Sequence, residues 1–158
     1  MFWTEVIIPG SIVWFIQLIL SDFLAINNVR PDFIVILILY WSVQNGRFFG
    51  VISGTLLGFI VDLTGTANFF GLSPLIYSIT GYLSGNLYGK YKNLNPLYFS
   101  FVWITVILVQ FLLFCAVQYQ EIWIVNKELF LGKWFGTSIY TLAFLGIIQF
   151  IYPLNKLD

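Results

Sequence analysis

The sequence predicts an all-α polytopic membrane protein, folded as a single domain over residues 1–158 with a bundle of six transmembrane helices. The first supporting observation is composition, because 59% of the residues are hydrophobic and only 9% are charged. Soluble domains carry roughly 25% charged residues. The second is the mean hydropathy of +0.90. A soluble globule could not cover its surface with so few charges, so much of this surface is expected to face lipid.

The apolar stretches of the chain are about as long as a bilayer requires. A transmembrane helix needs about 20 mainly apolar residues, each adding about 1.5 Å along the axis. Such stretches recur along the sequence, separated by short polar or glycine-containing turns. We expect spans at about residues 6–26, 31–44, 47–65, 70–88, 97–119 and 130–152.

Local signals for helix starts support these boundaries. Ser73-Pro74 and Asn95-Pro96 each have the form of a capping residue followed by proline at the first helical position. Asp32 is expected in a first turn, where a carboxylate interacts favourably with the positive end of the helix dipole.

The residue counts exclude several classes of function. The chain has no histidine and one cysteine, which excludes a His/Cys metal site, a Ser-His-Asp triad and a disulfide within the chain. Seven basic residues balance seven acidic ones without forming a basic cluster, which argues against nucleic-acid binding. We therefore expect no enzymatic activity, no metal and no cofactor.

The distribution of basic residues favours one orientation in the membrane. Six spans place both termini on the same side, and short cytoplasmic loops carry an excess of Lys and Arg. The side of the termini would carry four basic residues and the opposite side three. The first group is Arg47, Lys90, Lys92 and Lys156, and the second is Arg30, Lys127 and Lys133. Both termini are therefore expected in the cytoplasm.

Glycines recur every four residues in two of the expected spans. The first ladder is Gly46, Gly50, Gly54 and Gly58, and the second includes Gly81 and Gly85. Small residues at this spacing allow close approach of another helix backbone. Two interpretations are open: packing within this bundle, or docking of a helix from another protein.

Four charged residues lie at or near membrane depth, where charge is costly and often functional. They are Asp22, Arg30, Asp32 and Asp62, and the predicted topology places all of them towards the outer face. We expect Arg30 to pair with Asp62 or Asp22 and so to hold the first three helices together.

Simpler roles remain open for these acidic residues. Asp32 could only cap a helix, Asp22 could be interfacial, and Asp62 could shape the turn that follows its span. A proton- or ion-coupled site is a further alternative. Three single amides inside spans are each expected to bond a neighbouring helix or, if they face inward together, to line a small cavity. They are Gln17, Gln110 and Gln149.

The order of these motifs resembles that of the rod-shape-determining protein MreD family. The motifs are the stretch Arg30–Phe33 (RPDF), the apolar run ending at Trp41, the glycine ladder ending at Asp62, and the stretch Phe70–Leu75 (FGLSPL). The resemblance covers about Val6–Tyr88. The last two spans match only in length and hydrophobicity.

The resemblance implies a role in the machinery that elongates the bacterial cell wall. Such proteins associate with MreC, which has one membrane helix and a periplasmic domain. Through MreC they connect the MreB filament to the RodA glycosyltransferase and its partner transpeptidase. Because this chain has few basic residues at its cytoplasmic ends, any link to MreB is expected to run through a partner.

The same resemblance leaves a second function open. The MreD family is similar in fold to the six-helix S-components of energy-coupling-factor vitamin transporters. A substrate-binding subunit of a vitamin or small-molecule transporter is therefore the alternative to a scaffold. That class needs an outward-facing pocket with a few convergent polar groups, whereas a scaffold requires only a well-packed centre.

Overall fold

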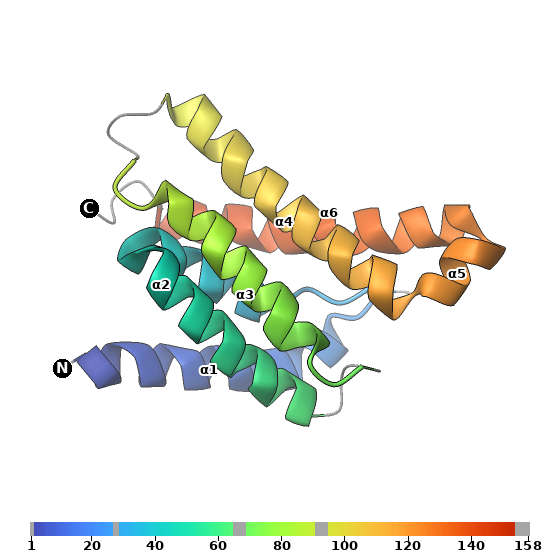
Figure 1. Ribbon diagram of the computed structural model, residues 1–158, viewed down its shortest axis with the longest axis horizontal. Helices are drawn as coiled ribbons and strands as arrows, with labels where there is room; N and C mark the ends of the chain where they lie inside the picture. The colour runs from blue at the N-terminus through green and yellow to red at the C-terminus, as the bar shows by residue number, and fades with distance from the viewer. Residues whose placement is uncertain (1, 27–28, 65–68, 91–94, 154–158) are drawn as a thin grey trace.

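Every regular element of the protein is helical in the part of the chain that the structure describes (Figure 1). The computed structural model describes residues 2–26, 29–64, 69–90 and 95–153, except for the side chains of residues 2, 3, 5, 21 and 22. The elements are α1 (Phe2–Phe23), α2 (Phe33–Leu63), α3 (Leu72–Ser84), the short 3₁₀ turn η1 (Gly85–Leu87), α4 (Pro96–Gln118), α5 (Gln120–Val125) and α6 (Lys127–Ile151).

The long helix α2 reverses direction at Gly46. This residue has φ 87° and ψ −178°, a conformation that only glycine adopts without strain. A Cβ atom on Gly50 would collide with Oγ of Ser42, although residues eight apart in a straight helix are separated by about 12 Å. We call residues 33–45 the inner arm of α2 and residues 47–63 its outer arm. The expected spans 31–44 and 47–65 fall on these two arms.

The inner arm lies at the centre of the bundle. Ile34, Val35, Ile38 and Leu39 are completely inaccessible to solvent, and Ile36, on the opposite side of the helix, is only 3% exposed. A helix that is apolar all round is buried all round, which explains why this stretch lacks an amphipathic pattern. The ring of Phe33 also meets that of Phe144 on α6, with centroids 5.2 Å apart.

The outer arm packs backbone against backbone with α3. A Cβ atom on Gly54 would collide with the carbonyl group of Tyr77, and one on Gly81 would collide with the carbonyl group of Gly50. Glycine at these positions therefore brings the two helix axes closer than any other residue would allow. This is the close approach expected of small residues in membrane helices.

The rest of both ladders serves the same contact. A Cβ atom on Gly58 would strike the backbone of Pro74, and one on Gly85 would lie 2.5 Å from the Cα atom of Arg47. The structure thus uses the glycines for packing within the chain, the first of the two interpretations. Gly46 makes the chain reversal instead of a helix contact.

The helix starts were predicted with mixed success. Oδ1 of Asn95 accepts a hydrogen bond from the backbone N–H of Leu97, and α4 begins with proline as expected. The cap predicted at Ser73 was wrong, because α3 begins at Leu72, two residues before the expected first position Pro74, and its N-cap is Gly71. Gly71 has φ 95°, so its left-handed backbone sets the direction in which the chain enters the helix.

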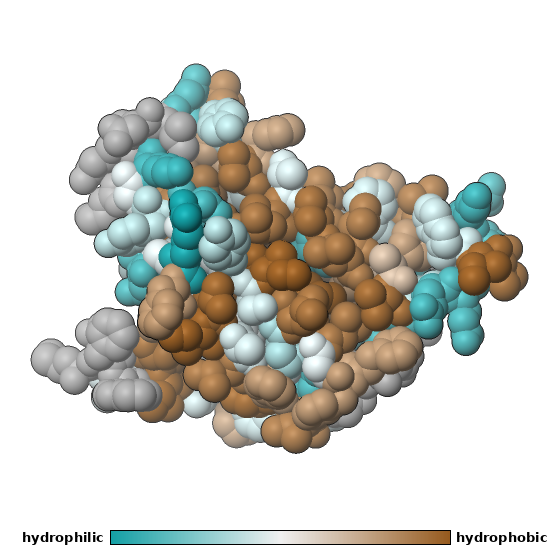
Figure 2. Space-filling model, viewed as in Figure 1, coloured by the Kyte–Doolittle hydropathy of each residue, from teal (hydrophilic) through white to brown (hydrophobic). Residues whose placement is uncertain are grey.

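The surface has the character expected of a membrane protein. Among the described residues, α4 and α6 are each long and apolar enough to cross a bilayer, and α1 contains a shorter apolar stretch. The 31 residues of α2 reach that length only when they are counted together across the reversal at Gly46. Figure 2 shows apolar side chains across the middle of one face, with hydrophilic ones gathered towards its ends, including the end beside α5. Phe48 and Phe150 are 82% and 93% exposed. The count of six spans stays a prediction, because α3 has only 13 residues.

Substitution of Gly54 tests the α2–α3 contact. Gly54→Ala should lower the free energy of unfolding by about 1–3 kcal/mol, the usual cost of overpacking, because the colliding group is backbone and cannot rotate away. The chain carries its own reporter of unfolding, since its one cysteine, Cys115, is completely buried. Labelling of Cys115 by a maleimide dye during heating in detergent measures the loss.

Gly146→Ala on α6 is the matched control, because a Cβ atom there meets nothing within 4 Å. It should be neutral or stabilise the helix by about 0.5–1 kcal/mol. If both variants exposed Cys115 at the wild-type temperature, the close α2–α3 contact would not contribute to stability.

Candidate functional site

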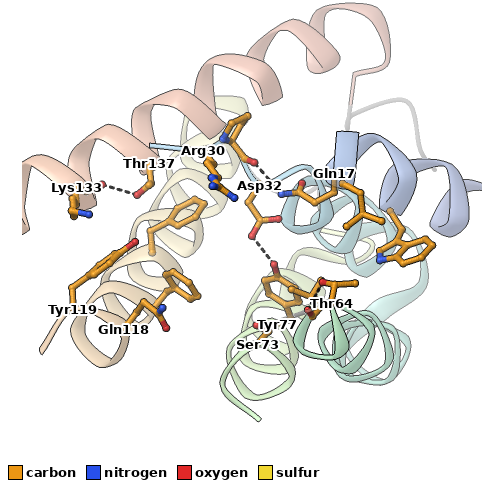
Figure 3. Close-up of a pocket in the computed structure, with 16 residues that line it drawn as sticks. Gln17, Arg30, Asp32, Thr64, Ser73, Tyr77, Gln118, Tyr119, Lys133 and Thr137 are labelled. Carbon is orange, nitrogen blue, oxygen red and sulfur yellow. Dashed lines mark hydrogen bonds between the residues drawn. The ribbon is translucent and has the colours of Figure 1, made fainter. Parts of the chain in front are cut away.

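A polar cavity of about 470 Å³ opens where the start of α2 meets α1, α3, α4 and α6. Figure 3 shows labelled side chains from several of these elements converging on it. Its walls combine polar groups with apolar and aromatic ones, the usual composition of a ligand site. The lining residues are Trp14, Gln17, Leu18, Arg30, Pro31, Asp32, Val61, Thr64, Ser73, Tyr77, Phe111, Phe114, Gln118, Tyr119, Lys133 and Thr137.

Asp32 caps the inner arm of α2 from the floor of this cavity. Its Oδ1 accepts hydrogen bonds from the backbone N–H groups of Ile34 at 3.1 Å and Val35 at 3.2 Å. Its Oδ2 accepts a hydrogen bond of 2.7 Å from the hydroxyl of Tyr77 on α3. The expected first-turn position of Asp32 is therefore a true N-cap, and the residue also links α2 to α3.

The other donors at the start of α2 are also satisfied by side chains from different helices. Oε1 of Gln17 on α1 accepts a hydrogen bond of 2.7 Å from the backbone N–H of Phe33, and Nε2 of Gln17 donates to the carbonyl of Pro31 at 3.2 Å. Oγ1 of Thr141 on α6 accepts from the backbone N–H of Asp32 at 3.2 Å. Gln17 thus bonds a neighbouring element, as expected, whereas Oε1 of Gln110 is buried without a hydrogen-bond partner.

Two basic residues lie on the side of the cavity opposite Tyr77. Arg30 comes from the segment between α1 and α2 and is exposed, and Lys133 comes from α6. Nζ of Lys133 lies 4.3 Å from the centroid of the Tyr119 ring, within the range of a cation–π interaction. Next to Tyr119, Oε1 of Gln118 is buried without a hydrogen-bond partner. Figure 3 shows Lys133, Tyr119 and Gln118 grouped on this side, with Arg30 between them and Asp32.

Asp62 lies apart from the cavity lining. It is buried at the end of α2, and its Oδ2 accepts a hydrogen bond of 2.5 Å from the backbone N–H of Gly71. Asp62 therefore links the end of α2 to the backbone of Gly71, the residue before α3. Its expected part in shaping the turn stays a prediction, because residues 65–68 lie outside the described ones. Its Oδ1 is buried without a hydrogen-bond partner.

The structure thus brings together only part of the predicted charge cluster. Arg30 and Asp32 line one cavity, Asp62 contacts Gly71, and the side chain of Asp22 lies outside the described residues. Pairing of Arg30 with Asp62 or Asp22 stays a prediction.

Sequence reasoning did not assign Tyr77, Gln118, Tyr119 or Lys133 to a site. Tyr77 is 45 residues from the carboxylate that it contacts, and no spacing rule joins two such positions. Lys133 entered the sequence argument only as a loop charge.

The chemistry of this cavity suits binding. Cationic, carboxylate, amide and hydroxyl groups converge on it from several elements and could orient a polar molecule against apolar walls. Within the described residues, no group of three or more His, Cys, Asp or Glu side chains could hold a metal ion.

Comparison with known proteins gives one match. The family model for rod shape-determining protein MreD matches residues 2–156, so the similarity continues through α4 and α6, beyond the motifs that carried the resemblance. None of the curated proteins and none of the solved structures matches the chain.

Two substitutions of Asp32 separate its charge from its hydrogen bonds. Asp32→Ala should lower the free energy of unfolding by about 1–2 kcal/mol, because it removes the cap and the partner of Tyr77. Asp32→Asn should be tolerated at neutral pH, because an amide still caps the helix, can bond Tyr77 and places no charge in the interior. Thermal unfolding followed by Cys115 labelling compares the two variants.

Proposed function

We propose that this chain, which belongs to the family of rod shape-determining protein MreD, is a non-enzymatic scaffold of the complex that elongates the peptidoglycan wall. Membership of this family makes it a membrane protein of rod-shape determination, which fits its long apolar helices. The finer proposal is that it binds MreC by helix packing in the bacterial inner membrane, with both termini in the cytoplasm. Through MreC it would act indirectly on MreB, RodA and the partner transpeptidase.

The observation that carries the docking proposal is an apolar groove between α1 and α2. The glycine faces of α2 and α3 already cover each other, so a partner helix must use another surface. The groove has a volume of about 400 Å³ and contains the small residues Gly10, Ser11 and Ser53. Its full lining is Val6, Ile7, Gly10, Ser11, Trp14, Trp41, Ser53, Leu56, Leu57 and Ile60.

This groove has the chemistry of a helix-docking surface in lipid. Ile7 and Leu56 on its rim are 54% and 60% exposed, so the chain itself leaves them uncovered. Helices associate in a bilayer through close van der Waals packing at small residues, and Gly10 and Ser11 offer such positions on α1. The single membrane helix of MreC is the occupant that the family relationship suggests.

The polar cavity favours one second candidate. An S-component-like subunit of a vitamin or small-molecule transporter would need such a pocket, with polar groups converging from several helices. The proposed orientation places the cavity on the outer side of the membrane, as that function requires. The partners recovered from the native membrane distinguish the two candidates, because a transporter subunit would bring ATPase subunits with it.

Filling the groove tests the docking proposal. Ser11→Phe should reduce the amount of MreC that co-purifies with this protein in mild detergent by roughly tenfold or more, because a ring at Ser11 occupies the space that the partner helix needs. Ile12→Phe is the matched control, because Ile12 is the next residue of α1, is exposed and does not line the groove. Quantitative mass spectrometry of the co-purified proteins measures both.

The heating profile of Cys115 labelling shows whether each variant is folded. Equal loss of MreC from both folded variants would point to a general disturbance of α1 and would contradict docking in the groove. Recovery of ATPase subunits in place of MreC would replace the scaffold with the transporter candidate.

A further inference from the structure

Two basic residues and one acidic residue line the polar cavity. Both carboxylate oxygens of Asp32 already accept hydrogen bonds from Ile34, Val35 and Tyr77. Lys133 contacts the face of the Tyr119 ring, an interaction that uses its charge without requiring all three of its N–H donors. Arg30 adds a second positive charge to the lining. The cavity is therefore suited to an anion.

Near these cations, one buried hydrogen-bond acceptor lacks a donor. Oε1 of Gln118 is buried and has no hydrogen-bond partner, and a buried polar group without a partner costs about 1–3 kcal/mol. An anion without an N–H or O–H group cannot donate to this oxygen. A ligand that combines an anionic group with a hydroxyl group would satisfy both Lys133 and Gln118.

The remaining walls and the size of the cavity limit the ligand further. Leu18, Phe111 and Phe114 contribute apolar surface, which suits the carbon skeleton next to a charged group. A volume of about 470 Å³ lies within the range of small-molecule sites. The cavity lies in the half of the bundle where α1 and α4 end and α6 begins. A lipid headgroup on that side of the membrane would therefore be near it.

We propose that this cavity binds a phosphate ester carrying free hydroxyl groups, with Lys133 and Arg30 at the phosphate and Oε1 of Gln118 accepting from a hydroxyl. The glycerophosphate headgroup of an anionic phospholipid and a water-soluble polyol phosphate share this chemistry. This role goes beyond partner docking, because the cavity and the α1–α2 groove have different linings apart from Trp14.

Native mass spectrometry of the purified full chain in detergent tests the proposal. The wild type, mixed with equal amounts of phosphatidylglycerol and phosphatidylcholine, should retain more phosphatidylglycerol. Lys133→Gln should lower the ratio of the two bound lipids by roughly tenfold, the effect of losing one charge-assisted hydrogen bond. Lys127→Gln is the matched control, because Lys127 is also on α6 and faces an aromatic ring, that of Trp123, but does not line the cavity.

A second variant tests the hydroxyl contact. Gln118→Leu should weaken retention of phosphatidylglycerol but not of phosphatidylmethanol, a phosphodiester of the same charge without headgroup hydroxyls. Equal effects on the two lipids would overturn the assignment of Gln118.

Competition with glycerol 1-phosphate distinguishes the two sources of the ligand. Displacement of the lipid by this soluble phosphate would assign the site to a free polyol phosphate, and persistence of the bound lipid would assign it to the headgroup. The proposal is overturned if the wild type shows no preference for phosphatidylglycerol and binds no glycerol 1-phosphate. It is also overturned if Lys127→Gln lowers the lipid ratio as much as Lys133→Gln does. The wild-type measurements need no variant, so they decide the matter even if Lys133→Gln does not fold.

Discussion

The structure depends on satisfying the buried start of the inner arm of α2. The first N–H groups of any helix lack partners within the helix, and in an apolar interior each unpaired group costs free energy. Here Gln17 accepts from Phe33, Asp32 accepts from Ile34 and Val35, and Thr141 accepts from Asp32 itself. Because these acceptors come from α1, from the segment before α2 and from α6, the capping of one helix fixes the positions of several others.

The glycine contact between the outer arm and α3 works together with this capping. Tyr77 belongs to both, because its carbonyl lies against Gly54 and its hydroxyl donates to Asp32. Close approach of the two helices therefore sets the depth at which the Tyr77 ring enters the bundle and reaches the carboxylate. The packing of Gly54 against α3 involves no polar side chain, yet it positions Tyr77 in the polar wall of the cavity.

Local sequence signals predicted those features that depend on neighbouring residues. The four-residue spacing of Gly50, Gly54 and Gly58 predicted a close helix contact, and Asn95-Pro96 predicted the start of α4. The expected spans 31–44 and 47–65 left only residues 45 and 46 for a reversal, which is where the structure has it. The positive φ of Gly46 followed from no local pattern, because the spacing had assigned this glycine to the ladder of the next helix.

The cavity was predictable only in part. The charge of Arg30 and Asp32 at membrane depth indicated a polar region, but its other walls come from residues far away in sequence, such as Tyr77 and Lys133. Gln118 illustrates the limit, because an amide near a helix end is unremarkable until its oxygen is found buried without a donor. Helix packing, and not sequence spacing, decides which of these side chains meet.

One side chain connects the partner groove with the cavity. Trp14 on α1 lines both, and its Nε1 is buried without a hydrogen-bond partner. The rotamer that Trp14 adopts therefore shapes two surfaces at once, since interiors are close-packed and a large ring cannot move without affecting what it touches. A helix seated in the groove would press on one face of α1, while Gln17, one turn further along, holds the start of α2 from the same helix. Any displacement of α1 by a partner would thus also displace the capped start of α2 and the α1 wall of the cavity.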